Sequence, residues 1–296
     1  MLGCLLFHLM SPRLRIALAA LLFSTGGAAI KAADFNAWQI ASFRSGIAAL
    51  TLLLLVPAAR RGFGWKPALV GLAYAATLVL FVLANRLTTA ANTIYLQSTA
   101  PLYVLLLAPL LLKEPIRRRD LPVIGAVLGG LALVLLAGGH PSTTAPDPVR
   151  GNIFAALSGL SYALLLCGLR WLGKNHNTDI GISAVILGNI IASLAALPMA
   201  LPLGPHPAVA WGVILYLGVF QIAGAYLLVT SALRHLPAIE ASLMLLVETA
   251  FNPLWVWLLL GEVPAVMVLL GGGLIVGATI LQAMRSPSLV PAPDIV

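Results

Sequence analysis

The segments AANTIYLQSTAPLYVLLLAPLLLKEP (90–115) and AIEASLMLLVETAFNPLWVWLLLGE (238–262) hold equivalent places in the two halves of this chain. The offset between them is 148 residues, the separation of position 114 from position 262. Four pairs of identical residues share this offset: Arg86 and Arg234, Glu114 and Glu262, Gly125 and Gly273, and Gly129 and Gly277. An internal repeat in a chain with many hydrophobic spans is typical of secondary transporters.

The composition places the chain outside the soluble class. Mean hydropathy is +1.02, 60% of the residues are apolar and 9% are charged. A helix needs about 20 apolar residues to cross a hydrocarbon core ~30 Å thick. Ten runs approach this length: 14–33, 37–57, 67–84, 91–111, 121–138, 152–170, 181–203, 208–232, 239–260 and 264–283.

Five runs in each half predict an inverted repeat, because an odd number of crossings places the second copy upside down in the membrane. We therefore expect an all-α polytopic membrane protein with ten transmembrane helices in two inverted five-helix repeats. The expected divisions are an N-terminal extension (1–13), a first repeat (14–138), a linker (139–151), a second repeat (152–284) and a disordered tail (285–296).

The distribution of basic residues predicts that both termini lie in the cytoplasm. With this orientation thirteen Lys and Arg fall on the cytoplasmic side and three, Lys31, Arg86 and Arg150, on the other; Arg44 lies within a run. Such a bias obeys the positive-inside rule. The basic loops follow the second and fourth runs in the first half but the sixth and eighth runs in the second, as inversion requires. The net charge of +8 is thus explained by cytoplasmic loops, without nucleic acid.

Both quoted segments resemble the ten-helix EamA-type exporters of the drug/metabolite transporter superfamily. That family's pattern is a small-residue helix start, a mid-helix proline and a terminal L-x-E thirteen residues later. Pro101 and Glu114 have this spacing; in the second half Glu262 matches, Thr249 stands at the proline position and Pro253 follows one turn later. The resemblance covers residues 14–284.

The resemblance implies a secondary transporter of the bacterial inner membrane that exports amino acids, aromatic ones included, or similar small metabolites by alternating access. The alternative within the superfamily is a drug or other-metabolite exporter coupled to protons. A nucleotide-diphosphate substrate would need several basic groups in the cavity, and only Arg44 is available.

The run 239–260 contains an acid near its centre. Glu248, Asn252 and Trp255 are spaced i, i+4 and i+7, so they share one helical face. Because an ionisable residue at membrane depth is costly, it marks a functional site by default. Glu248 is expected to meet a substrate ammonium or to carry a proton. The alternative is a structural carboxylate that pairs with Arg44, for which a structural or gating role is expected.

Hydroxyl and aromatic side chains recur on other runs and would suit a cavity for an aromatic or apolar side chain with a zwitterionic head. Taken singly, each could equally serve helix packing. The expected cavity residues are Tyr74, Phe81, Tyr95, Ser98, Thr99, Tyr103, Ser158, Ser161, Tyr162, Gln221, Tyr226, Glu248, Asn252 and Trp255.

Two G-x-x-x-G patterns predict close helix packing. Gly125 and Gly129 lie in the run 121–138, and Gly273 and Gly277 in 264–283. Small residues at this spacing let helix backbones approach, so these two runs are expected to form scaffold outside the cavity, with a dimer face as the alternative. Lys31, at the end of the first run, is expected to be interfacial.

The sequence lacks the motifs that would indicate other classes of function. The sequence contains no P-loop, no H-E-x-x-H and no D-D-x-x-D, and every histidine falls at a run end or in a loop. We therefore expect no enzyme, no cofactor and no metal. The two cysteines, Cys4 and Cys167, form no recognisable motif. The expected partners are a small-molecule substrate and membrane lipids, with the monomer as the working unit.

Overall fold

A computed structural model of the chain describes residues 10–111, 121–137, 141–173, 178–232 and 238–285. These residues are almost entirely helical and contain no β-strand; a single β-bridge pairs Ser142 with Ala145. The expectation of an all-α chain is confirmed. Glu114, Arg234 and most of both terminal segments lie outside the described residues.

The first half begins with a helix in two pieces. Its elements are α2 (Pro12–Ser24), α3 (Gly26–Ala32), α4 (Ala37–Leu55), the 3₁₀ turn η1 (Pro57–Gly62), α5 (Trp65–Leu87), α6 (Ala90–Gln97), α7 (Ala100–Leu111) and α8 (Leu121–Leu136). The second half comprises α9 (Pro148–Gly173), α10 (Thr178–Ala200), α11 (Ala208–Tyr216), the π-helical η3 (Leu217–Gly224), α12 (Ala225–Ala232), α13 (Ala238–Leu260) and α14 (Val266–Arg285).

All ten predicted runs contain helix. Among the described residues six helical segments are long and apolar enough to cross a membrane: Pro12–Ala32, Ala37–Leu55, Trp65–Leu87, Pro148–Leu169, Ile180–Ala200 and Ala208–Ala232. Leu121–Leu136, Val247–Leu260 and Val266–Ala278 are shorter apolar helices, and α6 with α7 occupies the run 91–111. The chain is therefore a multi-pass membrane protein.

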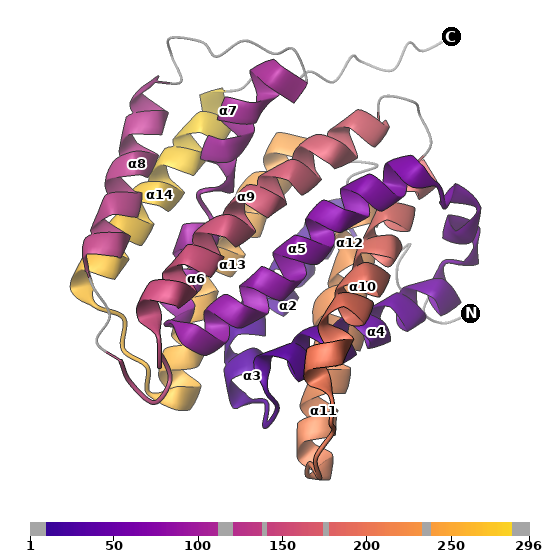
Figure 1. Cartoon of the computed structure of the whole chain (residues 1–296). Coiled ribbons are helices and arrows are strands. Elements are labelled where there is room, and N and C mark those ends of the chain that lie inside the picture. Colours follow the sequence, from indigo (N-terminus) through magenta and orange to yellow (C-terminus); the bar gives the residue numbers. More distant parts are fainter. Residues whose placement is uncertain (1–9, 112–120, 138–140, 174–177, 233–237, 286–296) are drawn as a thin grey trace, which may run out of the picture.

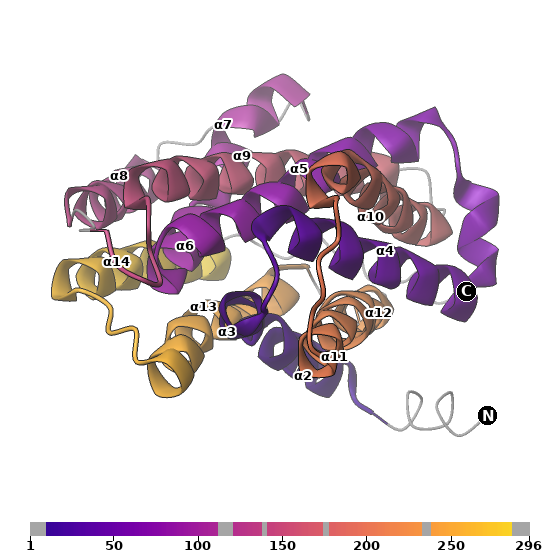
Figure 2. The ribbon, with the colours of Figure 1, turned by 60° about the horizontal axis from the view of Figure 1, so that its bottom comes forward.

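Equivalent helices of the two halves run in opposite directions (Figure 1). At the left of that view α8 descends and α14, beside it, ascends; the two remain neighbours in Figure 2. The contacts between helices also follow the repeat, so that a contact made by one half has its equivalent in the other. The third run (α5) packs on the sixth (α9), while the eighth (α12) packs on the first (α2).

The two quoted segments differ in how they accommodate proline. Pro101 is the second residue of α7, and helix α6 ends just before it, at Gln97. Proline has no N–H to continue the helical ladder, so the first segment is broken here. In the second segment Pro253 lies inside α13, which continues to Leu260.

The prediction that the G-x-x-x-G glycines form close helix contacts is wrong. A Cβ added to Gly125, Gly273 or Gly277 would meet nothing within 4 Å, and at Gly129 it would make only an ordinary contact with Leu274. The close approach of α8 to α14 involves different glycines, Gly130 and Gly271. A Cβ on either would lie 2.6 Å from the carbonyl oxygen of the other. The four predicted glycines share the repeat offset, but they do not form the contact between the two helices.

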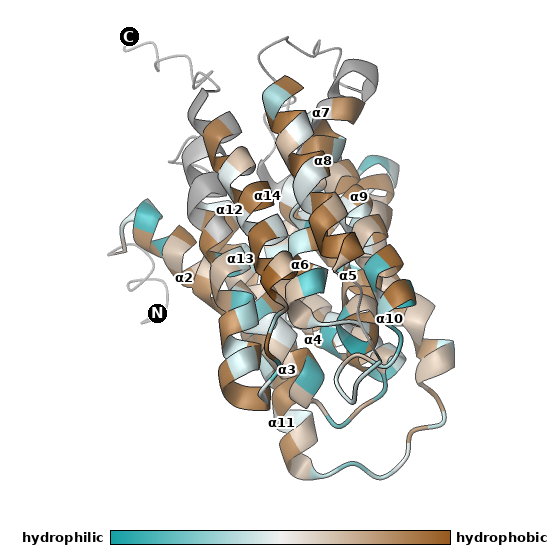
Figure 3. Cartoon of the chain, turned by 90° about the vertical axis from the view of Figure 1, so that its left-hand side faces the viewer, coloured by the Kyte–Doolittle hydropathy of each residue, from teal (hydrophilic) through white to brown (hydrophobic). Residues whose placement is uncertain are grey.

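The outer surface of the bundle is apolar. Leucines such as Leu54, Leu136 and Leu258 are exposed on α4, α8 and α13. Figure 3 shows hydrophobic residues along the helices and hydrophilic ones near the loops at the end that contains α3. An apolar surface of this kind is compatible with contact to lipid chains.

Candidate substrate site at the centre of the bundle

Five predicted residues gather near the middle of the bundle and form what we call the central polar cluster: Arg44, Tyr74, Tyr162, Tyr226 and Glu248. They come from α4, α5, α9, α12 and α13, and most lie close to the midpoints of the membrane-spanning segments. The side chain of Arg44 is the most unusual member, because the residue is only 1% exposed. Its Nη2 donates a hydrogen bond of 3.0 Å to the carbonyl oxygen of Leu78.

Two tyrosines lie near the guanidinium group of Arg44. Tyr74 and Tyr226 lie within its electrostatic reach, and their rings meet edge to face with centroids 5.2 Å apart. Phe23 of α2 also packs edge to face on Tyr226, with ring centroids 5.3 Å apart. Such geometries are favourable for aromatic pairs. The cluster therefore has a rigid aromatic wall next to a cation.

Glu248 approaches the same tyrosines from α13. Its carboxyl group is within electrostatic reach of Tyr162 and Tyr226, and the residue is partly buried. Glu248 and Arg44 form no ion pair with each other. The ion pair considered from the sequence is thus absent from this conformation, and no carboxylate among the described residues neutralises Arg44.

Asn252 and Trp255 share the α13 face of Glu248 but contact a different element, the junction of α2 and α3. Trp255 Nε1 donates to Ser24 Oγ at 2.9 Å. Asn252 is fully buried and its side chain lies directly against Gly27. Gln221, on the π-helical segment η3, lies in the same way against Gly26. These side chains make the junction of α2 and α3 a second polar region beside the cluster. The π-helical segment adds to its interest, because π-helical turns often occur at functional sites.

Most of the remaining predicted cavity residues make contacts within or between helices in this structure, and their place in a cavity stays a prediction. Tyr95 packs its ring against Gly272 of α14, Phe81 belongs to the apolar core, and Thr99 Oγ1 donates to the carbonyl oxygen of Leu96 at 2.6 Å. Ser98 and Ser158 join helices: Ser98 Oγ lies 3.1 Å from Thr249 Oγ1, and Ser158 Oγ donates to the carbonyl oxygen of Thr77 at 3.2 Å. Tyr103 and Ser161 are partly buried on α7 and α9.

Sequence reasoning missed Asn189, which is fully buried at the centre of α10 and lies beside Tyr74. Its Nδ2 donates to the carbonyl oxygen of Val185 at 3.0 Å. The signal was present in the sequence, since a lone amide in the middle of an apolar run is as informative as Glu248.

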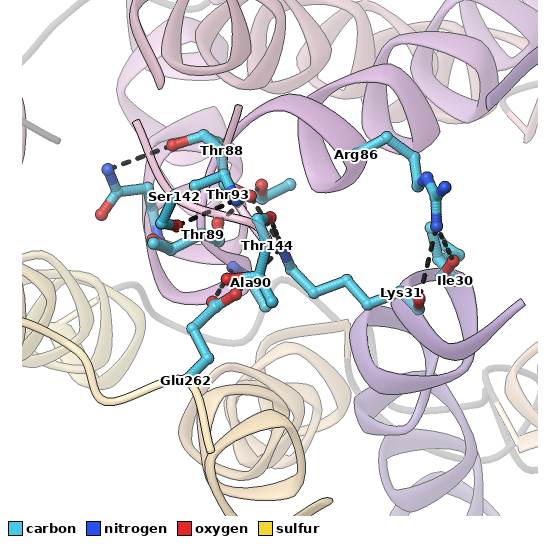
Figure 4. Close-up of polar contacts among 12 residues, drawn as sticks. Ile30, Lys31, Arg86, Thr88, Thr89, Ala90, Thr93, Ser142, Thr144 and Glu262 are labelled. Carbon is cyan, nitrogen blue, oxygen red and sulfur yellow. Dashed lines mark hydrogen bonds and ion pairs between the residues drawn. The ribbon is translucent and has the colours of Figure 1, made fainter. Parts of the chain in front are cut away.

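The Lys31 side chain, in the last turn of α3, is only 4% exposed and takes part in a set of polar contacts (Figure 4). Its expected place at the membrane interface stays a prediction. Its Nζ lies 3.0 Å from Glu262 Oε2 and donates to the carbonyl oxygens of Thr88 and Thr144, at 2.9 and 2.5 Å. Glu262 Oε1 accepts a hydrogen bond of 2.7 Å from the backbone N–H of Ala90. We call these five residues the Lys31 cluster.

A bundle of paired, oppositely directed helices around a buried polar cluster defines a multi-pass membrane transporter. Residues 12–136 and 149–284 each match the EamA-like transporter family, so both halves are copies of one unit. The chain belongs to this family, within the drug/metabolite transporter superfamily.

Two curated relatives are similar over most of their length. Both are described as pseudopaline exporters of Pseudomonas aeruginosa, from strains UCBPP-PA14 and PAO1. Each is 30% identical to this chain over 276 residues, covering 89% of this chain and 92% of the relative. A solved crystal structure is similar in fold, with a TM-score of 0.63 at 18% identity over 93% of this chain and 98% of that one.

Proposed function

We propose that this protein exports amino acids or closely related aminocarboxylates from the bacterial cytoplasm by alternating access, and that the central polar cluster binds them. In this proposal the protein lies in the inner membrane with both termini in the cytoplasm and works as a monomer. The family supports export, and the choice of substrate class rests on the chemistry of the cluster.

The observation on which the proposal rests is the buried, uncompensated charge of Arg44. A guanidinium held away from water without a counter-charge is costly. Among the described residues, its recorded partners are the carbonyl oxygen of Leu78 and the tyrosines Tyr74 and Tyr226. A substrate carboxylate would neutralise it, and guanidinium is well suited to bind carboxylates. Arg44 is therefore the proposed carboxylate site.

Glu248 is the acidic residue within the same group of tyrosines. A carboxylate at this place would bind the ammonium group of a substrate whose carboxylate lies at Arg44. Because Arg44 and Glu248 form no ion pair, neither is neutralised by the other. Tyr74, Tyr162 and Tyr226 would then cover the substrate's apolar or aromatic portion.

The relatives suggest a second candidate substrate. The similar proteins from Pseudomonas aeruginosa are described as pseudopaline exporters, so pseudopaline or another metabolite is the second candidate. Proton coupling is the other open alternative, in which Glu248 would exchange a proton instead of binding an ammonium group.

The test is counterflow in proteoliposomes containing the purified chain. Vesicles are loaded with unlabelled phenylalanine, tyrosine, leucine or histidine, and entry of the labelled compound is measured with and without a pH gradient. Competitors are N-acetyl-phenylalanine, which lacks the ammonium, and phenethylamine, which lacks the carboxylate. Empty liposomes provide the background.

The proposal requires that at least one amino acid exchanges above background and that both single-group analogues compete about tenfold more weakly, the loss expected when ~1.4 kcal/mol of binding is removed. Equal competition by phenethylamine would contradict the role of Arg44. Exchange confined to compounds without a carboxylate would reject the substrate class. Uptake that occurs only with a pH gradient would support the proton-coupled alternative.

A further inference from the structure

We infer that the ion pair between Lys31 and Glu262 is the outer gate of the transporter: it holds the two repeats together at the end of the bundle that faces away from the cytoplasm. The inference rests on the proposed function only in assuming alternating access. Its test uses no substrate, so the gate can fail while the substrate proposal stands, and the reverse.

The cluster joins parts of the chain that belong to different repeats. Lys31, Thr88 and Ala90 come from the first repeat, Glu262 follows α13 in the second, and Thr144 lies in the segment between the two. Figure 4 shows the Lys31 and Glu262 side chains extending toward one another from these separate elements. Any movement that separates the repeats at this end must break their contact of 3.0 Å.

Burial makes this contact different from a surface ion pair. The Lys31 and Glu262 side chains are 4% and 6% exposed. An exposed pair contributes little to stability, whereas one buried partner left without the other is strongly unfavourable. The pair therefore behaves as a two-state contact. It is stable when closed, and it can open only when water or another group replaces both partners.

Both charges are also held by directional partners. Lys31 Nζ donates to the two carbonyl oxygens of Thr88 and Thr144. Glu262 accepts from Ala90, the first residue of α6, where free N–H groups and the helix dipole favour a negative charge. The arrangement consequently selects a cation at position 31 and an acid at position 262.

Arg86 acts as a positioning residue for Lys31. Its Nη1 lies 3.4 Å, 3.3 Å and 3.4 Å from the carbonyl oxygens of Ile30, Lys31 and Ala33, at the end of α3. These contacts attach α3 to α5 within the first repeat, so that the Lys31 side chain is directed across to the second.

A second set of hydrogen bonds closes the same end. Thr88 Oγ1 donates to Asn152 Oδ1 at 2.8 Å, and Asn92 Nδ2 donates to the same oxygen at 3.0 Å. Asn152 lies near the start of α9, in the second repeat. The distribution of Lys and Arg along the chain assigns this end to the outside, which makes the closed contact an outer gate.

The experiment measures access to the centre of the bundle from outside. A single cysteine replaces Asn189, which lies beside Tyr74, in a chain with Cys4→Ser and Cys167→Ser. Intact cells are treated with a membrane-impermeant maleimide, and the labelling rate is compared with the rate in inside-out vesicles. The gate variant is Lys31→Met with Glu262→Gln, because this change removes both charges together and keeps an acceptor for the Ala90 N–H.

The control removes another ion pair at the same end. Arg150 and Asp147 also form an ion pair, of 3.5 Å, but their side chains are 76% and 40% exposed and the two residues are only three positions apart in the sequence. Arg150→Met with Asp147→Asn should leave labelling unchanged. The single variant Glu262→Gln provides a second gate variant should the double variant fail to accumulate in membranes.

We expect the gate variants to label from outside about tenfold faster than the parent, the population shift that ~1.4 kcal/mol produces, while labelling from the cytoplasmic side slows. Outside labelling equal to that of the parent, in protein that elutes as a single folded species, would overturn the gate. Faster labelling only in inside-out vesicles would overturn its assignment to the outer side.

Discussion

Arg44 and Glu248 both lie within electrostatic reach of Tyr226, yet they form no ion pair with each other. A guanidinium and a carboxyl group that share a neighbouring tyrosine without pairing with each other are each available to a different group of one ligand. Under the proposed function a zwitterion would be preferred over a cation or an anion, because only a zwitterion could occupy both proposed sites.

Replacing Arg44 with Gln should remove the carboxylate site while keeping a hydrogen-bond donor near the Leu78 carbonyl oxygen. A charge-assisted hydrogen bond contributes about 1.5–3 kcal/mol, so amino-acid affinity should fall by about ten- to a hundredfold. The measurement is half-maximal competition in counterflow. Arg60→Gln is the matched control, because Arg60 is exposed in η1 and donates only to the carbonyl oxygen of Leu53. Equal losses in both variants would contradict the assignment.

Glu248→Gln keeps the size of the side chain and removes its charge. If Glu248 binds the ammonium, the variant should weaken amino acids and spare N-acetylated analogues. If Glu248 carries protons instead, transport driven by a pH gradient should disappear while exchange down a concentration gradient remains. Both quantities are measured in the same proteoliposomes. Full transport with unaltered preference and pH dependence would remove Glu248 from the site.

The double variant Arg44→Gln with Glu248→Gln separates two binding sites from a structural ion pair. Since the two side chains do not contact each other, the losses in affinity should be at least as large as in the worse single variant. A structural ion pair would give a different result. Removing both partners would then avoid the cost of a buried unpaired charge and restore activity that each single variant loses. Activity recovered in the double variant would therefore refute the separate-site arrangement.

Much of the fold could be predicted because the lengths of the apolar runs indicate where helices form along the whole chain. Each apolar run contains helix, and Arg44 and Glu248 could be singled out because charges within a membrane span are costly. Sequence spacing also placed Glu248, Asn252 and Trp255 on one face of α13. It could not show that Glu248 faces tyrosines while the other two face the junction of α2 and α3.

The glycine contact between α8 and α14 and the burial of Lys31 could not be predicted, because both depend on the packed arrangement of the helices. The repeat offset identifies equivalent positions, but it does not show how a helix is rotated about its axis. It therefore points to Gly129, whereas the neighbouring Gly130 makes the close contact. A lone lysine at a helix end usually reaches the interface, so the sequence could not show that the Lys31 side chain is buried against another part of the chain. Its partner, Glu262, is far away in sequence, and only the folded chain brings the two together.

Helix packing between α8 and α14 predicts opposite changes in stability when two glycines of α8 are replaced with alanine. A Cβ at Gly130 would lie 2.6 Å from the carbonyl oxygen of Gly271 and 2.7 Å from Ile275 Cγ1, so Gly130→Ala should destabilise the protein by roughly 1–3 kcal/mol. Gly125→Ala meets nothing within 4 Å and should stabilise α8 by up to ~1 kcal/mol. Apparent unfolding temperatures in detergent test both. A lower temperature for Gly125→Ala alone would restore the packing face expected from sequence.

Trp255 offers a last test of which face of α13 meets substrate. Its Nε1 donates to Ser24 Oγ at 2.9 Å, so Trp255→Phe should lose one hydrogen bond between α13 and α2 and destabilise the protein by about 1 kcal/mol. Substrate preference should not change, because the indole N–H is already engaged by the protein. Trp257→Phe is the control, since Trp257 is exposed on the surface of the same helix and its replacement should change stability by no more than ~0.5 kcal/mol. Unfolding temperature and counterflow competition are measured for both variants. An altered ranking of amino acids in Trp255→Phe, without loss of stability, would show that the indole belongs to the substrate site after all and would place the junction of α2 and α3 within it.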